Sequence, residues 1–256
     1  MNVANAAAVM HFTLLEMKRA RLWGFALVMV CIGCAIAEFA AVVSITETTD
    51  NRLVFYAATM RLATVLVTAL WVSTSVLREF HDNGVELALS RPISRSDWFI
   101  GKYLGYLSAA LCLIVLVAFP LIIQAPVPGL LWCLSLGLET VIMVAAAIAF
   151  AITLRQVTIA FSLVTGFYLL SRSIAAVVLM SREPTLDLTL SSNQYLVWLV
   201  EVLAIMLPDL ERFTQSAWLV GPLPTASAVC LLAVQAVVYA SLLIAVSLFD
   251  LHRRDF

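Results

Sequence analysis

Six long apolar stretches, separated by shorter polar connections, dominate the pattern of the chain. They are Leu22–Ile45, Tyr56–Leu77, Phe99–Ile123, Leu130–Leu154, Val157–Met180 and Ala226–Phe249. Crossing the hydrocarbon layer takes about 20 apolar residues in a helix, because backbone groups in lipid must hydrogen-bond one another. Each stretch reaches that length. The pattern therefore predicts an all-α integral membrane protein with six transmembrane helices, forming a single transmembrane domain over residues 1–256.

Composition agrees with a protein whose solvent is lipid. Hydrophobic residues make up 63% of the chain and charged residues 12%, and the mean hydropathy is +1.02. A soluble domain has roughly 45–50% apolar and 25% charged residues, and a core of this size cannot hide such an excess. The formal net charge of −1 and the absence of a basic stripe argue against a nucleic-acid partner.

Lysines and arginines are unevenly distributed about the six stretches. With an even number of spans both termini share one side of the membrane, and ten of the fifteen basic residues fall there: Lys18, Arg19, Arg21, Arg78, Arg91, Arg95, Lys102, Arg155, Arg253 and Arg254. Basic residues favour the cytoplasmic side. We therefore expect a multi-pass protein of a bacterial cytoplasmic (inner) membrane with both termini in the cytoplasm. The first apolar run is longer than the roughly 7–15 residues of a signal peptide, which predicts an uncleaved anchor.

Residues 1–21 mix apolar and charged positions before the first span. Val9, Phe12 and Leu15 alternate with polar positions that include Glu16. This pattern suits an amphipathic helix that lies in the cytoplasmic interface with its apolar face toward the membrane. A simple helical extension of the first span fits the same residues.

The external segment 181–225 contains a second short apolar run. Tyr195–Leu207 is too short to span the membrane, so it predicts a re-entrant or interfacial external helix. Such a helix either shapes an outer exit or simply anchors the chain at the interface through Tyr195 and Trp198.

The connection 78–98 has the most distinctive sequence of the chain. Asp82 or Asn83 can cap a short helix there, and Pro92 stops its continuation. The helix would expose Leu87 and Leu89 to water, which a plain connector does not need. Exposed apolar groups on a short helix indicate a docking element for a soluble partner.

A second helix start follows Pro92. Ser94 or Ser96 can cap it, with Asp97 favourably placed in its first turn. We therefore expect a short cytoplasmic helix held between the second and third spans, with apolar and acidic side chains exposed together.

The same connection resembles the signature of type 2 ATP-binding-cassette (ABC) transporter permeases. In that family a glutamate, a glycine, a second glutamate, a leucine pair and an S-R-P-[IV]-S-R run lead into a G-K pair. The matching residues are Glu79, Gly84, Glu86, Leu87, Leu89, Arg91, Pro92 and the pair Gly101-Lys102. The ending Leu248–Phe256 is similar to the family's aromatic-then-R-D-[LF] ending. Family members share six spans, so the topological match covers nearly the whole chain.

The resemblance implies a permease subunit of an ATP-driven exporter, which is not itself an enzyme. Two permease copies would form a homodimeric pathway, and two ABC ATPase subunits would each receive the coupling helix near Gly84–Ser90. ATP and magnesium would be bound by the ATPase, so no cofactor is expected in this chain. A periplasmic accessory protein is a further candidate partner. The stretch Leu207–Phe213 is similar to permeases of nitrous oxide reductase maturation.

The chain itself has no phosphate-binding loop. Gly101-Lys102 is the only Gly-Lys pair, and Ser96 stands five residues before Gly101, where the Walker A motif requires another glycine. The sequence therefore places the energy source on another polypeptide.

Apart from Lys102 at the start of the third stretch, four charged residues fall in predicted spans: Glu38, Arg61, Glu139 and Arg172. Each costs roughly 2.5–3.5 kcal/mol at the bilayer centre, so each should face protein or water. They either line a translocation path or pair helices structurally. The structural role is favoured for Glu38 and Arg61, which lie nearer the outer boundary.

Two rival functions remain: an ion-coupled secondary transporter that uses Glu139 and Arg172, and a non-transporting membrane scaffold.

Cys31 and Cys34 form a C-x-x-C pair in the first span, one turn before Glu38. Thiolates bind soft metals such as Cu(I). Two sulfurs alone make an incomplete site, and cysteine in lipid is a small packing residue. The sequence therefore predicts no metal site.

Overall fold

The computed structural model of the chain describes residues 3–19, 22–43, 48–82, 94–182, 192–213 and 217–253. Within these ranges the secondary structure is helical throughout, without strands. The elements are α1 (Val3–Arg19), α2 (Leu22–Val43), α3 (Thr48–His81), α5 (Arg95–Gln124), α6 (Pro126–Leu154), α7 (Val157–Arg182), α8 (Ser192–Met206), the 3-10 helix η1 (Leu210–Phe213), α9 (Ala217–Val220) and α10 (Ala226–Arg253).

Six of these helices are long and apolar enough to cross a membrane: α2, α3, α5, α6, α7 and α10. They coincide with the six apolar stretches, so the prediction of a multi-pass helical membrane protein is confirmed at this level. The prediction for the second span was too short at both ends. α3 has 34 residues, about 50 Å of helix at 1.5 Å per residue, and therefore exceeds the hydrocarbon thickness.

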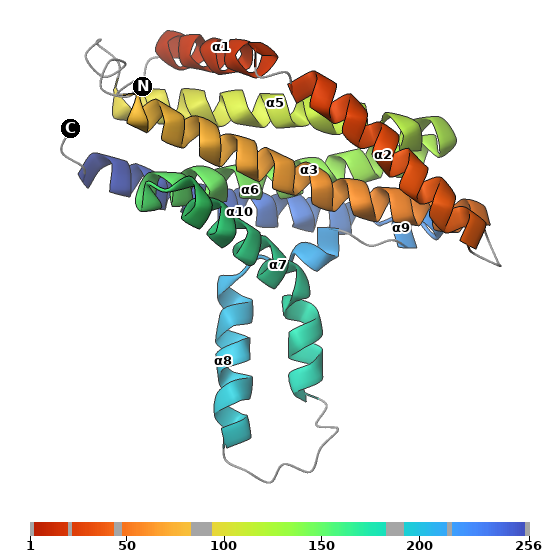
Figure 1. Cartoon of the computed structure of the whole chain (residues 1–256). Coiled ribbons are helices and arrows are strands. Elements are labelled where there is room, and N and C mark those ends of the chain that lie inside the picture. The colour runs from red at the N-terminus through yellow and green to blue at the C-terminus, as the bar shows by residue number, and fades with distance from the viewer. Residues whose placement is uncertain are drawn as a thin grey trace.

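The helix α6 forms the centre of the bundle (Figure 1) and packs against α3, α5, α7 and α10. In the most apolar stretch of α6, 78% of the residues are buried, whereas in the corresponding stretch of α10 only 17% are. Small residues such as Ala145, Ala146 and Ala147, all with no exposed surface, allow neighbouring helices to approach closely. Side chains on α6 are therefore the ones best placed to contact several helices at once.

Two ends of the bundle can be distinguished. At the end that we name the loop end, α3 finishes at His81, α5 begins at Arg95 and α10 finishes at Arg253. At the opposite end, which we name the far end, α5 finishes at Gln124 and α6 begins at Pro126. The helix α1 also packs at the loop end (Figure 1). The side of the membrane on which the chain ends lie stays a prediction.

The helix α1 lies alongside the first half of α5 and runs in the same direction. A Cβ atom on Gly101 would lie 2.7 Å from the carbonyl oxygen of Ala6, and one on Gly105 would lie 2.7 Å from Cβ of Thr13. The spacing Gly-x-x-x-Gly thus provides the groove that admits α1. A helix is present where the amphipathic one was predicted, and its interfacial placement stays a prediction.

The end of α7 and the helix α8 form a hairpin that projects from the bundle (Figure 1). The hydroxyl of Tyr239 on α10 donates to the carbonyl oxygens of Ile205 (3.2 Å) and Leu207 (3.0 Å), which fixes the end of α8. The short apolar helix predicted over Tyr195–Leu207 therefore exists as α8. Its re-entrant or interfacial placement stays a prediction.

We predict that Gly105→Ala lowers the thermal unfolding midpoint of the purified protein in detergent. An added methyl group must displace α1, and overpacking costs about 1–3 kcal/mol, more than the roughly 0.5–1 kcal/mol by which alanine favours a helix. The matched control is Gly166→Ala on α7, where a Cβ atom meets nothing within 4 Å, so its midpoint should stay equal or rise. Equal changes in the two variants would contradict the close approach of α1.

Candidate functional site

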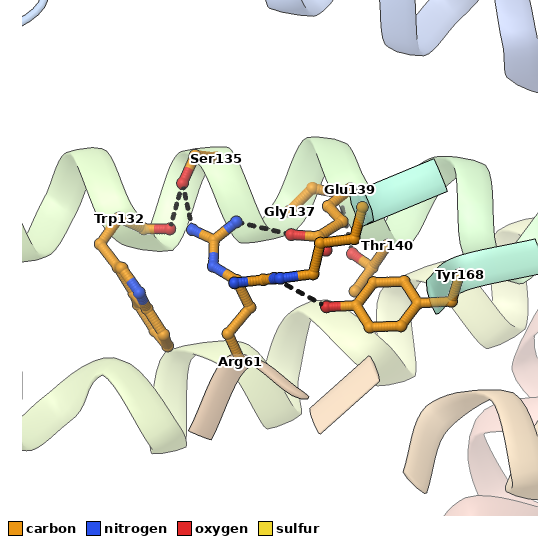
Figure 2. A network of polar contacts seen from close by, with 8 residues as sticks. Arg61, Trp132, Ser135, Gly137, Glu139, Thr140 and Tyr168 are labelled. Atoms are coloured by element: carbon orange, nitrogen blue, oxygen red, sulfur yellow. Dashed lines mark hydrogen bonds and ion pairs between the residues drawn. The ribbon is translucent and has the colours of Figure 1, made fainter. Parts of the chain in front are cut away.

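The first polar cluster lies in the middle of the bundle and is centred on Arg61 of α3. Its Nη1 atom is 2.5 Å from Oε2 of Glu139 on α6, and the two side chains are 1% and 0% exposed (Figure 2). Its Nη2 atom donates to Oγ of Ser135 at 2.6 Å, and its Cζ atom lies 5.6 Å from the centroid of the Trp132 ring. We refer to these residues, with Tyr168 and Arg172, as the mid-bundle cluster.

The spacing on α6 explains how one guanidinium meets three side chains. Trp132, Ser135 and Glu139 stand three and four residues apart, so they share one face of the helix. Arg61 faces them from the middle of α3. The requirement that intramembrane charges face protein was predictable, but the partner was not, because Arg61 and Glu139 are 78 residues apart in the chain.

The helix α7 adds Tyr168 and Arg172 to this cluster. Arg172 Nη1 donates to the hydroxyl of Tyr168 at 3.1 Å, and the Tyr168 side chain, which points toward Arg61 and Glu139 in Figure 2, has no exposed surface. Arg172 and Arg61 also line one small cavity. Three of the four predicted translocation residues, Arg61, Glu139 and Arg172, are thus brought together.

The fourth, Glu38, lies apart from them. It pairs with Arg52 at 2.9 Å, with side-chain exposures of 61% for Glu38 and 33% for Arg52. Arg52 Nη2 also donates to Oε1 of Gln124 at 2.5 Å, which places the pair at the far end. An exposed pair of this kind contributes little to stability.

The second polar cluster lies at the loop end and is centred on Lys102 of α5. Its Nζ atom is 2.7 Å from Oε2 of Glu79 on α3 and 3.8 Å from Oε2 of Glu16 on α1, and its side chain is only 3% exposed. Oγ of Ser75 donates to Oε1 of Glu16 at 2.7 Å and accepts from the hydroxyl of Tyr106 at 3.0 Å. This loop-end cluster therefore joins α1, α3 and α5.

Two further contacts fix the start of α5. The backbone N–H of Asp97 donates to Oγ of Ser94 at 3.1 Å, so Ser94 is the helix cap and the alternative cap, Ser96, is not. Arg95 Nη1 donates to the carbonyl oxygens of Leu251 (2.9 Å) and His252 (3.3 Å). A cation at the last carbonyls of a helix is favourable, and it ties α5 to α10.

Of the predicted ATPase-coupling residues, the structure describes only Glu79, which lies in the loop-end cluster. The others fall outside the described residues: Gly84, Glu86, Leu87, Leu89, Arg91 and Pro92. Sequence reasoning missed Glu16, Ser75 and Tyr106 as members of this cluster. A lysine that opens an otherwise apolar span was the available clue, since it requires a nearby carboxylate.

The described ranges hold no group of three or more His, Cys, Asp or Glu side chains suited to a metal ion. Cys31 is exposed on the surface of α2 and Cys34 is partly buried. The C-x-x-C pair thus stands without further ligands from the described part of the chain.

No family model matches the chain, and no curated protein matches it. The resemblance over Glu79–Gly105 therefore rests on those residues themselves.

We predict strong energetic coupling between Arg61 and Glu139. Replacing either residue alone by leucine leaves a buried charge and should cost about 3–5 kcal/mol. The double variant should be destabilised by clearly less than the sum, with a coupling energy of roughly 2–3 kcal/mol. Unfolding of the purified protein in detergent measures these values.

The matched control is the same cycle on Arg52 and Glu38. This pair is partly exposed, so its coupling should be below about 1 kcal/mol. Additive losses at Arg61 and Glu139 would contradict their pairing.

Proposed function

We propose that the chain is the membrane-spanning permease subunit of an ATP-driven ABC exporter in a bacterial cytoplasmic membrane. The observation that carries the proposal is the 2.7 Å ion pair between Glu79 and Lys102. It joins the two helices that flank residues 83–93, where the permease-like signature lies. A separate ATPase would bind this connection from the cytosol.

The loop-end cluster supports a mechanical role for this connection. Force applied to a loop moves a bundle only if the flanking helices move together. Here Lys102 joins α5 to α3 and α1, while Arg95 joins α5 to α10. A partner that presses on residues 83–93 would therefore move four helix ends as a unit, which is how closure of an ATPase dimer would change the packing of the spans.

The position of the loop-end cluster is also suitable for contact with a cytosolic ATPase. The excess of positive charge at the loop end favours a cytoplasmic location for it, and α3 exceeds the hydrocarbon thickness. Its last residues, including Glu79, would lie at or beyond the membrane surface, within reach of a soluble subunit. Two copies of the chain and two ATPases would make the transporter, and ATP and magnesium would be bound by the ATPases.

An ion-coupled secondary transporter is the alternative to an ABC permease, and the buried charges of the mid-bundle cluster favour it. Buried ionisable groups inside a bundle are typical of ion and proton pathways, and Arg61 and Glu139 are such groups. That function requires transport in vesicles without ATP, abolished by Glu139→Gln. A non-transporting scaffold requires neither ATP hydrolysis nor transport.

We predict that the tagged chain, purified from its native membrane in mild detergent, retains a Walker A-containing ATPase and hydrolyses ATP. Glu86→Ala should weaken retention of the ATPase roughly tenfold, as expected for a central interface residue. Lys102→Met should retain the ATPase but remove the effect of the permease on its hydrolysis rate, because α3 and α5 lose their connection.

Glu211→Ala serves as the control, since it also removes a carboxylate, exposed in this case, but lies in the external segment 181–225, away from the proposed docking side. It should behave as the unchanged protein. If Glu86→Ala and Lys102→Met retain the ATPase and its regulated hydrolysis in full, the connection is not the docking site.

A further inference from the structure

A large groove opens where the hairpin of α7 and α8 leaves the bundle beside α10 (Figure 1). Its volume is about 1100 Å³, just above the roughly 300–1,000 Å³ of a typical ligand site. The described walls on α7 and α8 are wholly apolar. The groove therefore has room and apolar surface for the hydrocarbon part of a ligand.

The segment that carries η1 adds a polar side to the groove. Oδ2 of Asp209 pairs with Nε of Arg212 at 2.7 Å, and the side chain of Asp209 is 23% exposed. The other carboxylate oxygen, Oδ1, is buried and has no hydrogen-bond partner in the described part of the chain. A buried carboxylate oxygen without a donor is costly. A ligand that donates a hydrogen bond to Oδ1 would remove that cost.

Asp209 is held in place from both sides. Leu210 and Phe213, each with no exposed surface, anchor η1 in the bundle. The hydroxyl of Tyr239 donates to the carbonyl oxygen of Leu207 at 3.0 Å, which fixes the chain just before Asp209. The acceptor is thus in position before a ligand arrives, which lowers the entropic cost of binding.

The wall on α10 combines apolar and polar groups. Leu231, Val234, Gln235 and Val238 are spaced three and four residues apart, so they share one face of the helix, and all four line the groove. The side-chain oxygen of Gln235 is a further acceptor among apolar neighbours. Tyr239 also lines the groove, and a tyrosine ring can attract a cation. A ligand with hydrogen-bond donors, positive charge and hydrocarbon groups matches this wall.

We propose that the groove binds an amphipathic amine, with an ammonium N–H donating to Oδ1 of Asp209 and the hydrocarbon part lying along the apolar walls of α7 and α10. The pair with Arg212 uses only one carboxylate oxygen, so the second can accept from the ammonium. A hydrogen bond between two charged groups is the strongest that this oxygen can make. The site does not depend on the proposed export function, and its test needs no ATPase.

Thermal unfolding of the purified chain in an uncharged detergent tests the site with octylammonium. Octyltrimethylammonium is the matched probe, because it has the same chain and charge but no N–H donor. A ligand that binds only the folded state raises the midpoint, here by roughly 3–5 °C for each tenfold rise in its concentration above the dissociation constant. Octylammonium should give this shift, and octyltrimethylammonium a clearly smaller one.

Three variants make the result specific. Asp209→Asn should abolish the octylammonium shift. Ala204→Trp fills the groove from α8, where Ala204 lines it, and should lose the shift with every charge retained. It decides the test if Asp209→Asn does not fold. Glu211→Ala is the matched control: it removes a carboxylate that lines the groove but is exposed, where solvent screens its charge, and it should keep the shift.

The site is overturned if the unchanged protein responds equally to the two probes. It is also overturned if Asp209→Asn or Ala204→Trp keeps the octylammonium shift, or if Glu211→Ala loses it. A shift with added phosphatidylethanolamine but none with octylammonium would make a lipid headgroup the occupant and would contradict the proposal.

Discussion

Charge inside the bilayer must be matched inside the protein, and the pair Arg61–Glu139 meets that constraint for the middle of the bundle. Lipid offers no water to either group, so both have to sit in the protein interior and face each other. The acceptor is on α6, which is the central helix and is lined by alanines that let its neighbours approach. The contact of α3 with α6 brings the two charges together, and Tyr168 and Arg172 of α7 lie beside them.

In the loop-end cluster a buried charge also needs partners within the protein, and here the partners come from two other helices. Lys102 is buried among Glu79, Glu16 and the rings of Phe12 and Tyr106. Its carboxylate partners belong to two other helices, so the charge that would be costly alone becomes the joint between α1, α3 and α5. The Arg61–Glu139 pair thus joins α3 to α6 in the middle of the bundle, while Lys102 joins α1, α3 and α5 next to the connection that carries the permease-like residues.

Much of the fold could be predicted from the sequence because the bilayer fixes helix length. Six apolar runs gave six membrane-length helices, and a serine before Asp97 gave the cap of α5. The partner of Glu139 could not be predicted, since sequence spacing does not report which helices touch. The groove at Gly101-x-x-x-Gly105 was not predicted, because its occupant, α1, is known only from tertiary contact. The coupling residues after Glu79 lie outside the described part of the chain, so their roles stay predictions.

The claim that the connection 83–93 faces a cytosolic ATPase is tested most directly by the side on which it lies. A membrane-impermeant maleimide is applied to spheroplasts that carry Asp82→Cys, at the loop end, or Leu223→Cys, just before α10, with the unchanged protein as the background. The proposed function predicts that Leu223→Cys is labelled in intact spheroplasts and Asp82→Cys only after lysis. Labelling of Asp82→Cys in intact spheroplasts would contradict it, because no cytosolic subunit could then reach the connection.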